Sequence, residues 1–133
     1  MTHNIKIIGT IRSTLKKLED CPLQESESAP QATVVIDPEY REAMKDIQRG
    51  DHLILFTWLH QSDRSTLTTH PRNDLTAPLH GVFSTRSPDR PNPIGMHIVE
   101  VASVVNENTF EVVSLEVLDG TPLIDIKPDL NRK

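Results

Sequence analysis

Hydrophobic residues along the chain gather in short runs that polar turns separate. Residues rich in Val and Ile fill "IKIIGTIRS" (5–13) and "TVVID" (33–37), and a nearly continuous apolar run, "HLILFTWLH", covers 52–60. Such runs are typical of β-strands, and the longest of them predicts a buried central strand. A further strand is expected at "HGVFST" (80–85).

The C-terminal part of the chain predicts a β-hairpin. The runs "MHIVEVASVV" and "TFEVVSLEVL" flank the turn residues "NEN" at 106–108. In the second run Val113, Leu115 and Val117 would share one face of a strand. After the turn "DGTP" (119–122), "LIDIKP" predicts a last short strand.

One helix is expected after the second strand. Pro38 stands at its start and Gly50 just past its end, which is the usual asymmetry of helix termini. Many short strands with one short helix predict a mostly-β fold, a small closed or half-closed barrel. A length of 133 residues suits a single domain over 1–133.

Composition limits the classes of function. Aromatic residues are only 4% of the chain, so the core is expected to be aliphatic. A net charge of −5 is unusual for a dedicated nucleic-acid binder, which is normally basic. The single cysteine, Cys21, excludes an internal disulfide. The start lacks the apolar core of a signal peptide, and no run approaches the ~20 apolar residues of a membrane span, so a cytoplasmic protein without membrane contact is expected.

The segment 61–78, "QSDRSTLTTHPRNDLTAP", shows no hydrophobic period over eighteen residues. An irregular connection of that length in a compact domain is usually functional or disordered. Arg64 is therefore expected on a mobile loop.

Several common kinds of site are not supported. None of the six histidines pairs with another at helical i, i+4 spacing, and a zinc site needs about four convergent ligands, so no metal is expected. Nothing near Cys21 would lower the pKa of its thiol as a nucleophile requires. Neither glycine-rich nucleotide-binding pattern occurs.

The stretch "GVFSTRSPDRPNPIG" (81–95) carries the strongest signal. Its three prolines restrict their own φ angles and the residues before them. A stiff loop loses little entropy on binding, and Arg86 and Arg90 can grip a carboxylate or phosphate. Asn92 can both donate and accept. The alternative is a rigid structural crossover whose arginines pair with acids of the chain.

Two further groups of residues give weaker signals of a functional site. Glu116, Asp119 and Asp125 surround an Asp-Gly turn and would either hold a cation or simply form that turn. His60 and Gln61 follow a buried strand directly, where residues often line a pocket, although a simple strand exit explains them as well.

Four blocks of the sequence resemble the TsaA-like family, the TrmO-type SAM-dependent tRNA methyltransferase domains. They are "GVFSTRSPDRPNPIG" itself, "LDGTPLIDIKP" (118–128), "IGTIRS" (8–13) and "LFTWLHQ" (55–61). The resemblance implies a β-barrel that binds S-adenosyl-L-methionine (SAM), forms homodimers and methylates N6 of threonylcarbamoyl-adenosine at position 37 of tRNA.

The resemblance also implies which residues form the site. The positions expected to bind SAM are Gln24, His60, Gln61, Arg86, Met96, Leu115, Glu116, Val117 and Leu118. Arg90, Asn92 and Asp119 are assigned to the substrate. No catalytic residue is identified, although His60 has an intrinsic pKa suited to a general base.

Two functional hypotheses follow. The first is a SAM-dependent tRNA methyltransferase. The second is a SAM-binding regulatory or accessory protein, or a methyltransferase of a small molecule. The net charge of −5 and the end of the chain at Lys133, without the C-terminal extension of bacterial relatives, weigh against tRNA.

Overall fold

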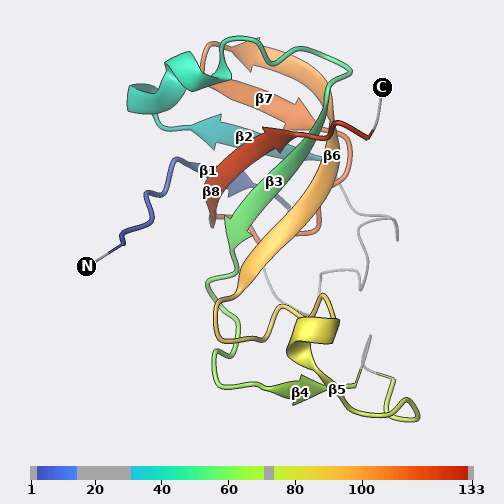
Figure 1. The fold of residues 1–133 in the computed structure, drawn as a ribbon. Coiled ribbons are helices and arrows are strands. Elements are labelled where there is room, and N and C mark those ends of the chain that lie inside the picture. Colours follow the sequence, from blue (N-terminus) through green and yellow to red (C-terminus); the bar gives the residue numbers. More distant parts are fainter. Residues whose placement is uncertain (1–2, 15–30, 71–73, 132–133) are drawn as a thin grey trace.

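The structure, a computed structural model, describes residues 3–14, 31–70 and 74–131 (Figure 1). Six antiparallel strands close into a barrel, and a separate two-stranded sheet lies below one end of it (Figure 1). The predicted mostly-β barrel is confirmed.

Each barrel strand pairs with an antiparallel neighbour on both sides. The order around the barrel is β1-β2-β7-β6-β3-β8, closing from β8 back to β1. Closure gives the sheet no first or last strand, although β8 pairs with β1 only over residues 121–123. The strands are β1 Gly9–Arg12, β2 Ala32–Ile36, β3 His52–Trp58, β6 Ile94–Asn106, β7 Thr109–Val112 and β8 Thr121–Pro128.

The core is aliphatic, as the composition predicted. Inward positions alternate with outward ones along the strands, so that Leu53, Leu55 and Thr57 of β3 point inward, and the apolar members of this set meet around Phe110. Alternation of this kind is what a strand with one buried face requires.

One two-residue strand and a single turn of helix occupy residues 80–84, where a longer strand was expected. β4 (Thr68–Thr69) pairs with β5 (His80–Gly81), and a 3-10 helix, η4 (Val82–Ser84), follows at once. The prediction of a strand over 80–85 is therefore wrong beyond Gly81. The irregular segment 61–78 also contains β4, so it is partly paired.

The expected helix is shorter than predicted. It is a 3-10 helix, η2 (Pro38–Met44), which buries Met44 and ends six residues before Gly50. Gly50 instead occupies a turn at φ 91°, a backbone conformation that favours glycine. Within the described residues, no helix has the length and apolar character needed to cross a membrane.

The second strand of the hairpin ends early. β7 stops at Val112, opposite the first residue of β2, Ala32, so the chain loses its partner on the β2 side there, although Val113 N still donates to Glu100 O of β6 at 3.0 Å. Leu115 and Val117 still reach the core from an irregular segment, whereas Val113 is exposed. The shared face predicted for these three residues is thus wrong for Val113.

The antiparallel pairing brings three connections to one end of the barrel. β3 ends at Trp58 opposite the first residue of β6, Ile94, and Thr57 lies opposite Leu123 near the start of β8. The segments after β3, before β6 and before β8 therefore meet at the lower end (Figure 1). We call it the loop end of the barrel.

A buried polar pair closes the interior at this end. Thr57 Oγ1 and His97 Nε2 lie 2.9 Å apart, on neighbouring strands. Gly95 lies beside them, and a Cβ built on it would come within 2.5 Å of Thr57 Oγ1 and 2.6 Å of His97 Nε2. Glycine is required here because the pair occupies the space of a side chain.

We expect Gly95→Ala to destabilise the fold by about 1–3 kcal/mol, as overpacking of an interior does. Gly81→Ala is the matched control, because a Cβ there meets nothing within 4 Å and the backbone has φ −62°. That control should be neutral or stabilising by up to about 1 kcal/mol. Urea unfolding of both variants measures the difference, and equal unfolding free energies would contradict the packing described.

Candidate functional site

The predicted signature forms a compact loop at the loop end of the barrel. We call residues 85–93 the proline loop. Its first half is held by alternating side-chain bonds: Thr85 Oγ1 accepts from Ser87 N at 3.1 Å, and Ser87 Oγ accepts from Asp89 N at 3.3 Å. Thr85 itself is tied to η4, since its Oγ1 donates to Val82 O at 3.0 Å.

The two arginines of the proline loop have different environments. Arg90 turns inward, and its Nη1 donates to Thr85 O at 3.1 Å and to Ser87 O at 3.0 Å. These two carbonyls stand on either side of Arg86 in the chain. Arg86 is exposed and forms no hydrogen bond or ion pair with the residues that the structure describes. One guanidinium thus braces the backbone that displays the other.

Each of the last three carbonyls of the proline loop accepts a hydrogen bond. Pro91 O accepts from Arg64 Nε at 2.8 Å, Asn92 O from Ile94 N at 2.7 Å, and Pro93 O from Leu59 N at 2.8 Å. Pro93 is also fully buried. Two of these three donors come from the segment that follows β3, so the two connections are fastened together.

Arg64, which the sequence placed on a loop expected to be mobile, is bonded to the proline loop. Besides its bond to Pro91 O, its Nη2 donates to Asn92 Oδ1 at 3.3 Å, and its guanidinium lies 5.1 Å from the centre of the Trp58 ring. An Arg over an aromatic face at that distance is a cation–π contact. The sequence offers no periodic signal for such a contact.

The residue before Arg64 adds a second bridge. Asp63 N donates to Asp89 Oδ1 at 2.8 Å, across the two connections. The carboxylate of Asp63 accepts from the hydroxyl of Ser65 at 2.6 Å and from its backbone N at 2.7 Å. These bonds lower the pKa of Asp63 below its usual 3.8, the hydroxyl first and the backbone N–H second. The turn at 63–65 therefore keeps its ionised acceptor until the pH falls below that value.

His60, Gln61 and the proline loop lie at the same end of the barrel. His60 and Gln61 are exposed in the turn after β3. They precede Arg64, which is bonded to the proline loop. Met96 lies on the outer face of β6 and is 37% exposed. Their binding of SAM stays a prediction, as do the roles of Arg90 and Asn92 toward the substrate.

The segment before β8 reaches the same end of the barrel, but most of its side chains that were predicted to bind SAM are buried. Leu115, Val117 and Leu118 are at most 7% exposed, so they face the interior, whereas Glu116 is half-buried. A role for the three apolar residues in binding would rest on their backbone groups. Met96 lies on the exposed outer face of β6, so its side chain is on the other side of the barrel wall from the buried ones.

The predicted acids have separate places. Asp119 Oδ1 accepts from Ser13 N at 3.0 Å, and its other oxygen lies 3.8 Å from Arg12 Nη1. Asp125 is an exposed residue of β8, and its Oδ1 accepts from Ile126 N. Across the described ranges, no three His, Cys, Asp or Glu side chains are grouped as a metal site would need. Gln24 lies outside the described residues.

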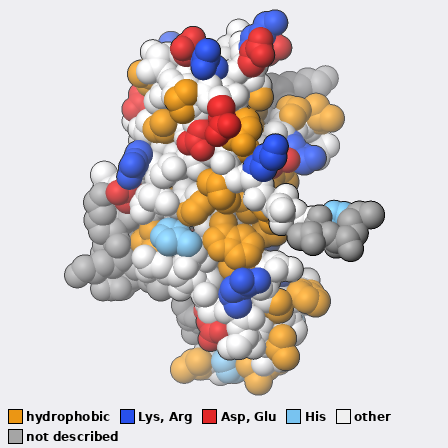
Figure 2. All heavy atoms as spheres, turned by 90° about the vertical axis from the view of Figure 1, so that its left-hand side faces the viewer, with side chains coloured by type: hydrophobic (Ala, Val, Ile, Leu, Met, Phe, Trp, Pro, Cys, Tyr) orange, Lys and Arg blue, Asp and Glu red, His pale blue; other side chains and the backbone are white. Residues whose placement is uncertain are grey.

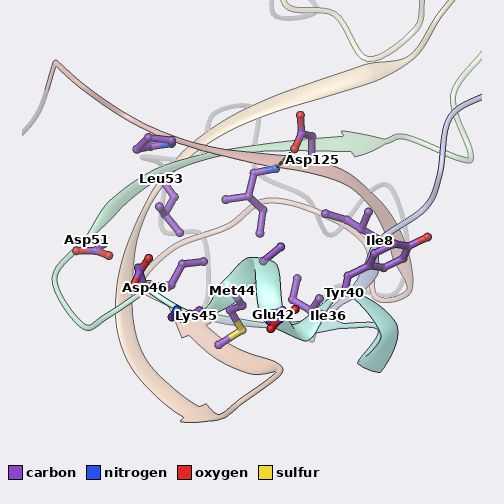
Figure 3. Close-up of a pocket in the computed structure, with 14 residues that line it drawn as sticks. Ile8, Ile36, Tyr40, Glu42, Met44, Lys45, Asp46, Asp51, Leu53 and Asp125 are labelled. Atoms are coloured by element: carbon purple, nitrogen blue, oxygen red, sulfur yellow. Dashed lines mark hydrogen bonds between the residues drawn. The ribbon is translucent and has the colours of Figure 1, made fainter.

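A cavity of about 460 Å³ lies at the opposite end of the barrel, beneath η2. Its apolar walls include Ile36, Met44 and Leu53, and its acidic residues include Asp51 and Asp125 (Figure 3). Charged side chains gather toward this upper end on the face shown in Figure 2. The lining of this cavity includes none of the described residues that were predicted to bind SAM or substrate.

Known proteins resemble this chain along most of its length. A "Probable S-adenosyl-L-methionine-binding protein VirR" of Rhizobium radiobacter is 43% identical over 122 residues, which are 92% of this chain and 68% of that protein. A "Probable S-adenosyl-L-methionine-binding protein" of Archaeoglobus fulgidus is 40% identical over 128 residues, which are 96% of this chain and 34% of that protein.

A solved structure shares the fold. The crystal structure of TrmO from Pseudomonas aeruginosa superposes with a TM-score of 0.75 at 31% identity, over 98% of this chain and 55% of that one. The chain thus spans about half of that protein and about a third of the Archaeoglobus relative. Residues 10–132, which include the proline loop, match the family described as the tRNA-methyltransferase O N-terminal domain. The predicted resemblance is confirmed, and the chain belongs to this family.

Proposed function

We propose that this chain binds SAM at the loop end of the barrel and transfers its methyl group to N6 of threonylcarbamoyl-adenosine at position 37 of tRNA. The observation that carries the proposal is Arg86, an exposed guanidinium on a loop whose backbone is braced on both sides. Membership of the family and the names of the relatives support SAM as the ligand.

The residues at the loop end suit the groups of SAM. The guanidinium of Arg86 offers planar donors for the carboxylate. The half-buried carboxylate of Glu116 has the sign that an ammonium group requires. SAM supplies a methyl group that its sulfonium activates. The chain would contribute alignment of the acceptor, which is the main requirement of a group transfer between two bound molecules.

The acceptor nitrogen must lose a proton, because the attached carbonyl delocalises its lone pair. His60 is exposed at the loop end and is a residue type that accepts protons near neutral pH. Its role as a base is a hypothesis. The alternative, a SAM-binding regulator or a methyltransferase of a small molecule, is favoured by the net charge of −5, which repels the phosphates of tRNA.

A homodimer through the outer face of β3 and β6 also belongs to the proposal. Three cross-strand pairs on this face are apolar: Ile54 with Ile98, Phe56 with Met96, and Trp58 with Ile94. Ile94, Met96 and Ile98 are 41%, 37% and 40% exposed. Because the chain is acidic overall, a stripe without acidic side chains is the surface on which two copies meet with least repulsion.

Arg86→Ala is expected to raise the dissociation constant for SAM about ten- to a hundredfold, since a lost charge-assisted hydrogen bond costs about 1.5–3 kcal/mol. Arg49→Ala is the matched control: it removes the same charge from an exposed turn away from the loop end. Isothermal titration calorimetry measures both. An equal effect of the two substitutions would remove Arg86 from the site.

The acceptor is tested by transfer of tritiated methyl groups from SAM to bulk tRNA. We expect incorporation into tRNA that carries threonylcarbamoyl-adenosine and none into tRNA that lacks the modification. Incorporation into both, or into neither while SAM still binds, would favour the alternative functions.

The dimer is tested by sedimentation equilibrium. Ile98→Asp places a charge in the apolar stripe and should weaken self-association by roughly two decades or more, as substitutions at central interface positions do. Val105→Asp, at the other end of β6 and 55% exposed, should leave it unchanged. A wild-type chain that sediments as a monomer at all concentrations would refute this part of the proposal.

A further inference from the structure

Arg64 joins the segment after β3 to the proline loop by three contacts of different kinds. Its Nε bonds the backbone of Pro91 at 2.8 Å, its Nη2 bonds the side chain of Asn92 at 3.3 Å, and its flat guanidinium lies 5.1 Å from the centre of the Trp58 ring. Together the contacts define both the position and the plane of the guanidinium.

The bond to Pro91 meets a need that the local backbone leaves open. Proline has no N–H group, so two of the three residues of the Pro91–Pro93 segment cannot donate to strand partners. The carbonyl groups of the segment must therefore accept hydrogen bonds from donors elsewhere in the chain. Arg64 supplies one of these donors from 27 residues away in the sequence.

The bond to Asn92 determines which way its amide faces. A guanidinium group only donates hydrogen bonds, so the atom of Asn92 that faces Arg64 must be the amide oxygen. The amide NH₂ group of Asn92 is therefore turned away from Arg64. Asn92 is exposed, as is Arg86 in the same loop, so both residues offer donors to solvent.

We propose that Arg64 is a positioning residue of the loop end: it fixes the proline loop against β3 and orients Asn92 to donate to an oxyanion of the bound ligand, a carboxylate or a phosphate. The inference rests on the proposed function, because the ligand is taken to be SAM or its tRNA acceptor. Asn92, which sequence alone left as donor or acceptor, is assigned as a donor.

We call the three contacts of Arg64 with Pro91, Asn92 and Trp58 the clamp. Trp58 provides a direct test of it, because this residue is the only tryptophan of the chain. In Arg64→Ala the ring loses its cover, so acrylamide should quench its fluorescence more strongly than in the wild type. Arg49→Ala should match the wild type, and Arg64→Lys, which keeps the charge but not the planar fork, should fall between. Equal quenching in Arg64→Ala and Arg49→Ala would overturn the clamp.

The effect on the ligand separates positioning from mere stability. Arg64→Ala should raise the dissociation constant for SAM or the KM for tRNA about two- to tenfold, because binding must then order the loop. Its melting temperature should stay close to that of Arg49→Ala. Unchanged ligand parameters beside increased quenching would show a clamp that does not serve the site, which refutes the proposal.

Asn92→Asp tests the donor assignment. The new carboxylate still accepts from Arg64, so quenching of Trp58 should stay at the wild-type value, but both amide N–H donors are lost. A weaker SAM affinity would assign the oxyanion to the carboxylate of SAM, and a raised KM for tRNA alone would assign it to the acceptor. If neither parameter changes, Asn92 is not a donor to the ligand.

A failure of the proposed function can be told apart from a failure of this inference. If the wild-type chain binds no SAM and methylates no tRNA, the proposed function and the ligand role of Asn92 fail together. The clamp itself is still decided by the quenching of Trp58, which needs no ligand.

Discussion

The hydrogen bonds that the Pro91–Pro93 segment receives from the segment after β3 are the constraint on which the loop end depends. A proline-rich stretch cannot form a regular ladder, because it lacks donors, yet its carbonyls still require partners when they leave water. Leu59 N and Arg64 Nε provide two of those partners. The exit of β3 and the entry of β6 are thereby held as one unit, although no strand pairs them beyond Trp58 and Ile94.

Because of that constraint, the three arginines of the loop end have different roles. Arg90 and Arg64 bond main-chain carbonyls, so their guanidinium groups act as braces within the loop end. Arg86 stands between the two carbonyls that Arg90 holds and is left to face outward. A displayed charge on a fixed backbone binds with less loss of entropy than one on a free loop. The prolines, Arg90 and Arg64 thus all hold the loop that displays Arg86.

Sequence alone predicted much of the barrel because short apolar runs and their alternation record which face of a strand is buried. The alternation placed Leu115 and Val117 on one face, and both are buried in the core, although the segment that carries them is not a strand. The alternation failed at 80–85, where β5 is only two residues long and η4 follows it directly. Local pattern does not show where a partner strand ends.

The candidate site was less predictable than the fold. Spacing within the signature marked Arg86 and Arg90 equally, since only the folded loop turns one inward and leaves the other exposed. Arg64 was missed because a bond from a side chain to a carbonyl 27 residues away leaves no pattern in the sequence. The Thr57–His97 pair, which explains Gly95, is likewise a contact between strands that sequence distance hides.

A crystal structure of the chain with SAM would show which arginine meets the ligand. We expect SAM at the loop end, with the guanidinium of Arg86 on its carboxylate, while Arg90 keeps its bonds to Thr85 O and Ser87 O and Arg64 stays on Pro91 O. SAM in the cavity beneath η2, or Arg90 swung out to bind the ligand in place of Arg86, would overturn the assignment of Arg86.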